Sequence, residues 1–432
     1  MLNLIKYSIP LILAYSSDML MSTVDTVFVG KLGMVEMAAI GFSSIFVWAL
    51  YNLFKGILIC VGTFVSTCHG KKDLTGARVA LWNGLFVAFI ASCLIFAFRY
   101  ILPFVLRNLN LPHDVWTCAN SYIDIRLLGA VGFLSSVAFA SYFRGINKPK
   151  YILYASIFSN ILNIILDYLL IYTFQYGITG AAVATAISQV VSLIIYTSLY
   201  FNEIGKFSFV HEVRLISKEN VRQLLVLGVP YSLKIFAEVF IYLAFTTMIG
   251  WIGSVELAAT AVMNQIFVFV GACAHAIGGA TQVLVGQNVG KNDMAEAKSY
   301  GLLAILLNAM VTVIFASILI IFNKYICFIF NEQPEVISSF SMIVVIGSIA
   351  LCFDGVHMVA GCALAGSYDT KFQFNLIIMV GYVLFLPITY LSISVYHNSL
   401  VMSWLLLAIF MFIMATILSV RFKVRRMNVI QG

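Results

Sequence analysis

The sequence predicts an all-α integral membrane protein with twelve transmembrane helices in two six-helix lobes. Three observations predict this class. First, 62% of the 432 residues are hydrophobic and 10% are charged, whereas soluble proteins carry about 25% charged residues. Second, apolar runs long enough to cross a ~30 Å hydrocarbon layer recur along the whole chain. Third, segments of the first half return in the second half.

The repeat has an offset of 220 residues. Residues 29–39 return as 249–259, and the loop 70–73 returns as 290–293. Two copies of one fold are expected to meet across an approximate two-fold axis. The chain is therefore predicted to use one structural unit twice.

The apolar runs predict the individual helices. The twelve predicted spans are 7–29, 38–66, 79–106, 117–144, 151–174, 178–201, 221–249, 257–286, 296–323, 338–365, 372–394 and 400–420. The first run lacks a small-residue cleavage site after it, which indicates a retained span rather than a signal peptide. The polar stretch 202–220 is predicted to be a cytoplasmic linker between an N-terminal lobe, 1–201, and a C-terminal lobe, 221–432. Because each lobe has an even number of spans, the repeats are parallel, and a cleft between them is typical of a transporter.

The basic residues predict the orientation in the membrane. With a cytoplasmic N-terminus, most Lys and Arg residues fall in cytoplasmic segments, which predicts that both termini are cytoplasmic. The same bias explains the net charge of +7. Since these residues form no single patch, we expect the lipid bilayer as a partner and no nucleic acid. We also expect a monomer.

Several other functions lack their sequence signals. No Walker A motif indicates nucleotide hydrolysis, and no Cys-x-x-Cys pair indicates a metal or redox centre. A membrane-embedded enzyme needs a paired nucleophile and base or a metal cluster, and a channel needs a continuous polar path. We therefore predict that the protein is not an enzyme and uses no cofactor apart from a coupling ion.

Ionisable residues inside the N-terminal spans are the strongest functional signal, because a charge at the bilayer centre costs at least a few kcal/mol. Asp18 and Asp25 are seven residues apart and share one helix face. Asn160, Asn163 and Asp167 are spaced three and four apart and share another. These two polar helix faces predict a polar site in the N-terminal lobe.

The depth of these residues is predicted from the helical rise of ~1.5 Å per residue. Asp25 and Asp167 then lie roughly 25–29 Å from the cytoplasmic edge, and Thr185 reaches a similar level. Such oxygens suit a hard cation, and two neighbouring carboxylates equally suit a shared proton. Asp25, Asn163, Asp167 and Thr185 are thus predicted to bind either H⁺ or Na⁺. The alternative is that the acids only satisfy hydrogen bonds between helices.

The C-terminal half carries a different set. Glu238 and Asp354 are candidates for cation or substrate binding, and Lys234, four residues before Glu238, is predicted to neutralise it. Lys55 and His275 occupy matching repeat positions and are weaker candidates for the cleft, as are Asp18 and Asn160. Asp124 and Arg126 are interpreted as structural.

A set of short motifs is spread over nearly the whole chain. They are Val24-Asp25-Thr26-Val27-Phe28-Val29-Gly30-Lys31-Leu32-Gly33 after Pro10, Phe143-Arg144-Gly145, Asn163-x-x-x-Asp167, Gly180-Ala181-Ala182-x-Ala184-Thr185, Gly228-x-Pro230 with Glu238, Gln287-x-x-Gly290, Phe353-Asp354-Gly355, Gly366 and Asp369-Thr370. With these motifs the sequence resembles a known family, the multidrug and toxic compound extrusion (MATE) transporters of the MOP superfamily.

The resemblance implies two six-helix lobes in a bacterial inner membrane and export of drugs or organic cations in exchange for H⁺ or Na⁺ by alternating access. The expected substrates are small, often cationic or amphipathic compounds. By resemblance, the DinF-like branch uses the N-terminal site, whereas the NorM-like branch uses Glu238 and Asp354. This chain has both sets, and it departs from the family pattern at His357 and Ala365. The alternative function is a flippase for lipid-linked oligosaccharides, although such proteins usually have more spans and a basic cleft.

Overall fold

A computed structural model describes residues 2–107, 112–204, 214–395 and 399–425, and every regular element in them is helical. The chain divides into two compact units. Ile9–Ser232 forms the N-terminal unit, and Leu233–Gly432 with Met1–Ser8 forms the C-terminal unit. The two boundaries fall inside continuous helices rather than in loops. The sequence-based division into 1–201, 202–220 and 221–432 stays a prediction, and residues 205–213 of the linker lie outside the described residues.

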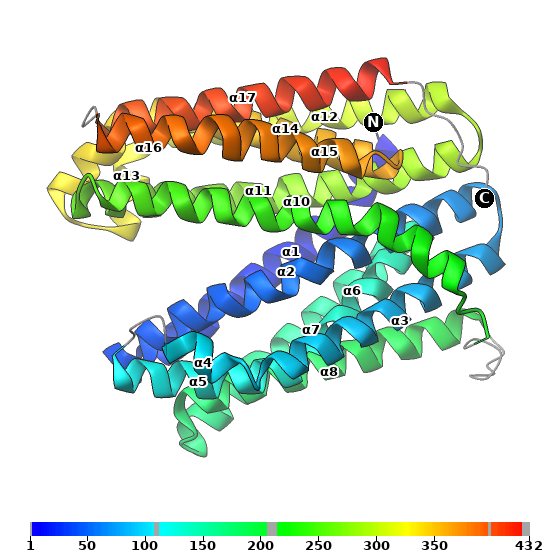
Figure 1. The fold of residues 1–432 in the computed structure, drawn as a ribbon, viewed down its shortest axis with the longest axis horizontal. Helices are drawn as coiled ribbons and strands as arrows, with labels where there is room; N and C mark the ends of the chain where they lie inside the picture. Colours follow the sequence, from blue (N-terminus) through cyan, green and yellow to red (C-terminus); the bar gives the residue numbers. More distant parts are fainter. Residues whose placement is uncertain (1, 108–111, 205–213, 396–398, 426–432) are drawn as a thin grey trace. The chain divides into compact units, whose positions relative to one another are not determined.

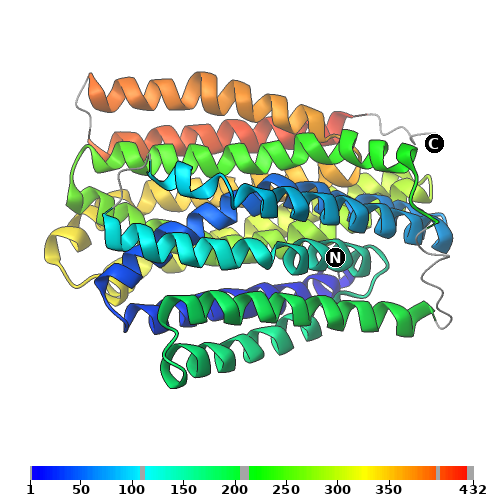
Figure 2. The same ribbon diagram turned by 60° about the horizontal axis from the view of Figure 1, so that its bottom comes forward.

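The N-terminal unit contains the first half of the helices, shown in blue to green in Figure 1. They are α1 (Leu2–Gly30), α2 (Met34–Gly70), α3 (Leu74–Phe98), α4 (Leu102–Arg107), α5 (His113–Leu128), α6 (Ala130–Gly145), α7 (Pro149–Asp167), the π-helical η1 (Tyr168–Thr173) and α8 (Gly177–Ile204). Helices α7 and α8 pack against each other and run side by side in both views (Figures 1 and 2). This pairing brings the polar face of α7 close to α8.

The C-terminal unit contains most of the remaining helices. They are α10 (Lys218–Gly250), whose first turns belong to the N-terminal unit, α11 (Ser254–Gly290), α12 (Met294–Ile321), α13 (Asn323–Phe330), α14 (Pro334–Gly366), α15 (Thr370–Ile377), the π-helical η2 (Ile378–Phe385), α16 (Leu386–Ser394) and α17 (Leu400–Val424). Helix α14 packs against α11, α12 and α17 and so forms the centre of this unit.

The helices account for all twelve predicted spans. Among the described residues, ten helical segments are long and apolar enough to cross a membrane, and α5 with α6, bent by 48°, adds an eleventh. Helix α1 is 29 residues long and carries Asp18 and Asp25, and it corresponds to the remaining predicted span. The all-α, multi-span class predicted from the sequence is confirmed.

The repeat is visible in the backbone. Lys72 and Asn292, which are 220 residues apart, both adopt the left-handed conformation, with φ of 60° and 62°. The next residues, Asp73 and Asp293, cap α3 and α12 by accepting hydrogen bonds from backbone N–H groups at 2.8 and 2.9 Å. Such caps satisfy N–H groups that have no partner inside the helix. The two halves therefore share their loop geometry as well as their sequence pattern.

The core of the C-terminal unit is aromatic and aliphatic. Trp404 of α17 is fully buried and packs edge-on against Phe245 at a centroid separation of 5.7 Å. Its indole N–H donates to the Thr260 hydroxyl at 3.3 Å, which satisfies the polar end of the ring. The interface of α11 and α14 depends on Gly366, where a Cβ atom would lie 2.4 Å from the Gln282 carbonyl oxygen. The two helices approach closely because this position has no side chain.

The part of the predicted linker just before α10, residues 214–217, is hydrogen-bonded to α3. The Asn83 amide donates to the Leu215 carbonyl at 3.1 Å and accepts from the Ser217 N–H at 3.0 Å. Asn83 is only 1% exposed, so these bonds are shielded from water. The entry to α10 is therefore held by one side chain rather than by apolar packing alone.

Asn83→Ala is expected to release residues 214–217. Because two backbone groups lose their partners, at about 1–3 kcal/mol for each buried group left unsatisfied, trypsin should cleave after Arg214 or Lys218 several times faster. Asn288→Ala is the control, because Asn288 is equally buried but its amide donates to the Leu284 carbonyl of its own helix at 2.9 Å. Equal cleavage rates in the two variants would show that Asn83 does not hold this segment.

Candidate functional site

Four predicted site residues come together in the N-terminal unit, on α1, α7 and α8. The Asn163 amide is oriented by its neighbours: its nitrogen donates to Asp25 Oδ1 at 2.9 Å and to Asp167 Oδ2 at 3.1 Å, and its oxygen accepts from the Thr185 N–H at 3.3 Å. The two carboxyl groups are also within hydrogen-bonding distance of each other. Asn163 and Asp167 are fully buried. We call this group the N-terminal acid site.

The backbone around the N-terminal acid site is unusual. The α-helical geometry of α7 ends at Asp167, and the π-helical segment η1 begins at the next residue. π-helical segments are rare and often occur at functional sites, because the extra residue in the turn redirects side chains. On α8, the Thr185 hydroxyl donates to the Ala181 carbonyl at 2.9 Å, which leaves its lone pairs free to accept a hydrogen bond or bind a cation.

Arg126 acts on the N-terminal acid site, although the sequence indicated only a structural role. Its charge acts on both Asp25 and Asp167, and its Nη1 has no hydrogen-bond partner among the described residues. Tyr51 holds the Arg126 backbone by donating to its carbonyl at 2.5 Å. The sequence signal for this role is a basic residue inside an apolar run. Asp124 instead pairs with Arg99 at 2.9 Å, as its structural interpretation predicts.

The second pair of N-terminal candidates forms a separate group nearer the start of α1. The Asn160 amide donates to Ser17 Oγ and to Asp18 Oδ1, both at 2.9 Å. Lys55 exerts an attraction on Asp18, and its ammonium lies 4.2 Å from the centre of the Trp48 ring. The two acids of α1 therefore belong to two polar groups, two helical turns apart.

The C-terminal candidates also lie together. Lys234 Nζ is 2.8 Å from Glu238 Oε1, which shows the predicted pairing along α10. His357 Nε2 lies 3.1 Å from the same Glu238 oxygen, and its Nδ1 lies 3.8 Å from Asp354 Oδ1. Lys234 and His357 are buried, with 7% of each side chain exposed, whereas Glu238 is 27% exposed. We call these four residues the C-terminal charge cluster.

His275, the remaining candidate of the C-terminal half, is exposed on α11. It remains a weak candidate for the cleft.

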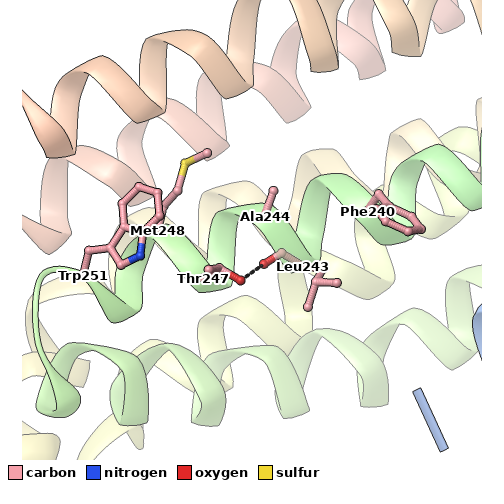
Figure 3. A pocket seen from close by; sticks show the side chains of 6 residues that line it. All are labelled: Phe240, Leu243, Ala244, Thr247, Met248 and Trp251. Atoms are coloured by element: carbon pink, nitrogen blue, oxygen red, sulfur yellow. Dashed lines mark hydrogen bonds between the residues drawn. The ribbon is translucent and has the colours of Figure 1, made fainter. Parts of the chain in front are cut away.

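An apolar cavity lies along the C-terminal half of α10. It has a volume of about 290 Å³, and Figure 3 shows the side chains that line it. They are Phe240, Leu243, Ala244, Thr247, Met248 and Trp251. At about 100° per residue along a helix, most of these side chains lie on the face of α10 opposite Glu238. The aromatic and Met surface is therefore distinct from the C-terminal charge cluster.

A family model supports the repeat and identifies the chain. The MatE model matches it twice, at residues 10–169 and 230–391, again at an offset of 220. The chain belongs to the MatE family. The matched segments contain Asp25, Asn163, Asp167, Glu238 and Asp354, whereas Thr185 lies outside them.

Individual proteins agree with this assignment. The chain is 23% identical over 397 residues to the probable multidrug resistance protein NorM of Mannheimia succiniciproducens, covering 90% of this chain and 85% of that protein. It is 26% identical over 396 residues to the multidrug resistance protein NorM of Vibrio cholerae, covering 90% and 86%. A MOP superfamily transporter from Pyrococcus furiosus has the same fold, with a TM-score of 0.90, 19% identity, and coverage of 97% and 94%.

These findings establish the general class of this MatE protein. Members of the family are membrane transporters and not enzymes, as the sequence predicted. The many apolar helices and the bacterial relatives support a multi-pass protein of the bacterial inner membrane. Most of the predicted site residues lie in three polar groups, two in the N-terminal unit and one in the C-terminal unit, and their roles stay predictions.

Proposed function

We propose that this MatE protein exports small organic cations and amphipathic drugs in exchange for protons, with the N-terminal acid site as the coupling site. Relatives across most of the chain are named multidrug resistance proteins, which supports the substrate class. The observation that carries the proposal is the Asn163 amide, whose nitrogen donates to Asp25 and Asp167 together. This amide holds two carboxyl groups close enough to share one proton.

The charges of the N-terminal acid site favour exchange of one proton for one positive charge. A hydrogen bond between two carboxyl groups requires a proton on one of them. With Arg126 positive and one acid protonated, the three groups sum to zero. When the proton leaves, the sum is one negative charge, which a monovalent cation can compensate. Because uncompensated charge is costly in a low-dielectric site, the proton-bound and cation-bound states are both favoured over the empty one.

The orientation of Asn163 favours H⁺ over Na⁺. A sodium ion needs oxygen ligands, so the amide would have to turn its oxygen towards the two acids. Its nitrogen would then face the Thr185 N–H, which is itself a donor. In the orientation that satisfies both neighbours, the oxygen accepts from Thr185 and the nitrogen faces the acids. We therefore propose a proton as the coupling ion.

The parallel repeat supports an alternating-access cycle with both termini in the cytoplasm. Two like units that each enter the membrane from the same side can rock against each other around a central site. Proton binding would favour one arrangement over the other only if the arrangements differ in proton affinity. We propose that protonation from outside accompanies release of the drug there.

The proposal is tested by transport in proteoliposomes with tetraphenylphosphonium as the substrate. A pH gradient and a Na⁺ gradient are imposed separately at a clamped membrane potential. We expect the pH gradient to drive uphill movement of tetraphenylphosphonium and the Na⁺ gradient alone to drive none. Vesicles without protein supply the passive rate. Transport driven by Na⁺ alone would refute proton coupling, and downhill flux unaffected by either gradient would refute antiport.

A further inference from the structure

Three basic side chains flank one acid in the C-terminal unit, where α14 ends, α15 begins and α17 ends. Asp369, between α14 and α15, has its Oδ2 atom 3.0 Å from Arg421 Nε and 2.8 Å from Arg425 Nη1 of α17. Lys371 follows in the first turn of α15 and is exposed. Most basic residues of the chain are spread over separate loops, whereas these four residues, which we call the basic corner, hold an excess of positive charge in one place.

Asp369 orients the two arginines rather than capping its own helix. It occupies the N-cap position of α15, yet its side chain makes no capping hydrogen bond. By contrast, Asp73 and Asp293 do cap α3 and α12. Because hydrogen bonds between guanidinium and carboxylate groups are strong and directional, Asp369 fixes where Arg421 and Arg425 point.

Arg421 keeps most of its hydrogen-bonding capacity in this arrangement. Its Nε donates to Asp369 Oδ2 at 3.0 Å, which leaves the four N–H groups of its terminal nitrogens. The guanidinium carbon lies 4.7 Å from the centre of the Phe372 ring, which supports the flat group from one side. With 44% of the side chain exposed, Arg421 can donate paired hydrogen bonds to a phosphate group.

Apolar side chains adjoin the basic corner on the same helices. Met379 comes seven residues, or about two turns, after Phe372 and so lies near the same side of its helix; it is 60% exposed. On α17, Val420 and Val424 stand one residue before and three residues after Arg421 and are 54% and 71% exposed. A molecule that fits both parts of this surface has an anionic head and apolar chains.

We propose that the basic corner binds the headgroup of an anionic phospholipid, with the phosphate on Arg421 and Lys371 and the acyl chains along the helix face that carries Met379. The corner lies at the ends of the helices that are predicted to be cytoplasmic. Basic pockets between transmembrane helices on that side are typical of sites for anionic lipids. This site concerns the surrounding lipid rather than the transported compound, so it does not depend on the exchange proposed above.

The N-terminal unit shows that membrane topology alone does not require such a corner. The turn before α7 matches the turn before α15, since Asn147 and Tyr368 both have a φ of 63°. The ion pair beside that turn has the opposite polarity, because Lys148 of the turn pairs with Glu203 of α8. Helix α8 contains no Lys or Arg. The positive-inside rule accounts for basic residues in the loops of both units, but only α17 adds two arginines at its end.

Lys150 supplies a matched control for Lys371. It is the second residue of α7, as Lys371 is the second residue of α15, and both side chains are exposed. Substitution by Gln removes one positive charge from the same place in either repeat, so the general attraction of the protein for anionic lipid falls equally. Only Lys371→Gln takes that charge from the basic corner.

The test is the melting temperature of the purified full-length protein in an uncharged detergent. It is titrated with short-chain phosphatidylglycerol, with phosphatidylcholine of the same chain length, or with inorganic phosphate. Because a ligand of the folded state raises the melting temperature as its concentration increases, each titration gives an apparent Kd. We expect phosphatidylglycerol to bind at least about fivefold more tightly than phosphatidylcholine, the factor for about 1 kcal/mol from one basic residue near an anionic lipid surface.

Lys371→Gln and Arg421→Gln should each raise the Kd for phosphatidylglycerol about fivefold for the same reason, and both should leave the Kd for phosphatidylcholine unchanged. Lys150→Gln should change neither value. Phosphatidylglycerol binding that is unaffected in both Lys371→Gln and Arg421→Gln would overturn the proposal. An equal loss in Lys150→Gln would also overturn it, because the attraction would then follow net charge rather than a site.

The phosphate titration separates a lipid site from a site for free anions. If inorganic phosphate protects the protein as well as phosphatidylglycerol does, with the same dependence on Lys371 and Arg421, the lipid assignment is wrong. The melting temperature without added lipid reports on folding. Since Lys371 is exposed, Lys371→Gln should melt like the unmodified protein, and it decides the outcome if Arg421→Gln is less stable.

Discussion

Asp25→Asn and Asp167→Asn are each expected to reduce proton-driven efflux of tetraphenylphosphonium to the passive rate of protein-free vesicles. Asparagine has the shape of a protonated aspartic acid but cannot lose a proton. With Arg126 positive and one acid remaining, the site is neutral without any exchange. Coupling free energies of about 1–3 kcal/mol correspond to about 5- to 150-fold, and the gradient-driven component should fall by an amount in this range.

The matched control is Asp124→Asn on α5. It removes an acid from the same unit and breaks the 2.9 Å ion pair with Arg99, which is not part of the N-terminal acid site. Its efflux should stay within about twofold of the unmodified protein, since partly exposed ion pairs contribute about 0–1 kcal/mol. Full proton-driven efflux in both Asp25→Asn and Asp167→Asn would exclude this site as the coupling site.

Gly366→Ala is expected to destabilise the C-terminal unit, because the added methyl group has no space between α11 and α14. The new Cβ would lie 2.4 Å from the Gln282 carbonyl oxygen and 3.1 Å from its Cα. Because both atoms are backbone, relief requires α11 and α14 to separate. Overpacking of this kind costs about 1–3 kcal/mol, and the melting temperature in detergent should fall by several degrees.

Gly271→Ala is the control for this substitution. A Cβ at Gly271 meets nothing within 4 Å, and alanine favours a helix over glycine by about 0.5–1 kcal/mol. Its melting temperature should therefore stay the same or rise slightly. If Gly366→Ala melted at the same temperature as Gly271→Ala, close approach of α11 and α14 at this position would not be a source of stability.

Much of the N-terminal acid site was predictable because spacing along a helix fixes the face of each residue. Asn163 and Asp167 are four apart on α7, and the depth of Asp25 on α1 could be counted from Lys6. Arg126 was not predictable as a partner, since its helix could turn it towards several neighbours. The packing of α5 against α2, where Tyr51 donates a hydrogen bond to the Arg126 carbonyl, contributes to where it lies.

The C-terminal charge cluster was only partly predictable for the same reason. The pairing of Lys234 with Glu238 is local, at four residues along one helix, and the structure shows it. The position of His357 between Glu238 and Asp354 joins residues more than a hundred positions apart. Sequence spacing carries no information on which faces of α10 and α14 meet. It therefore could not show that His357 lies between the two acids rather than as an isolated polar residue near a helix end.

The sequence by itself determined the class of the protein. Hydrophobic composition and span length decide whether a segment is stable in lipid, and the 220-residue repeat shows that one unit is used twice; none of these depends on specific contacts. It also determined which acids lie on common helix faces. Only the tertiary structure decided the orientation of Asn163, the effect of the Arg126 charge on two carboxyl groups, and the position of His357 between two others. These depend on which helices pack together, and in a membrane that choice follows from close packing and buried hydrogen bonds between particular side chains.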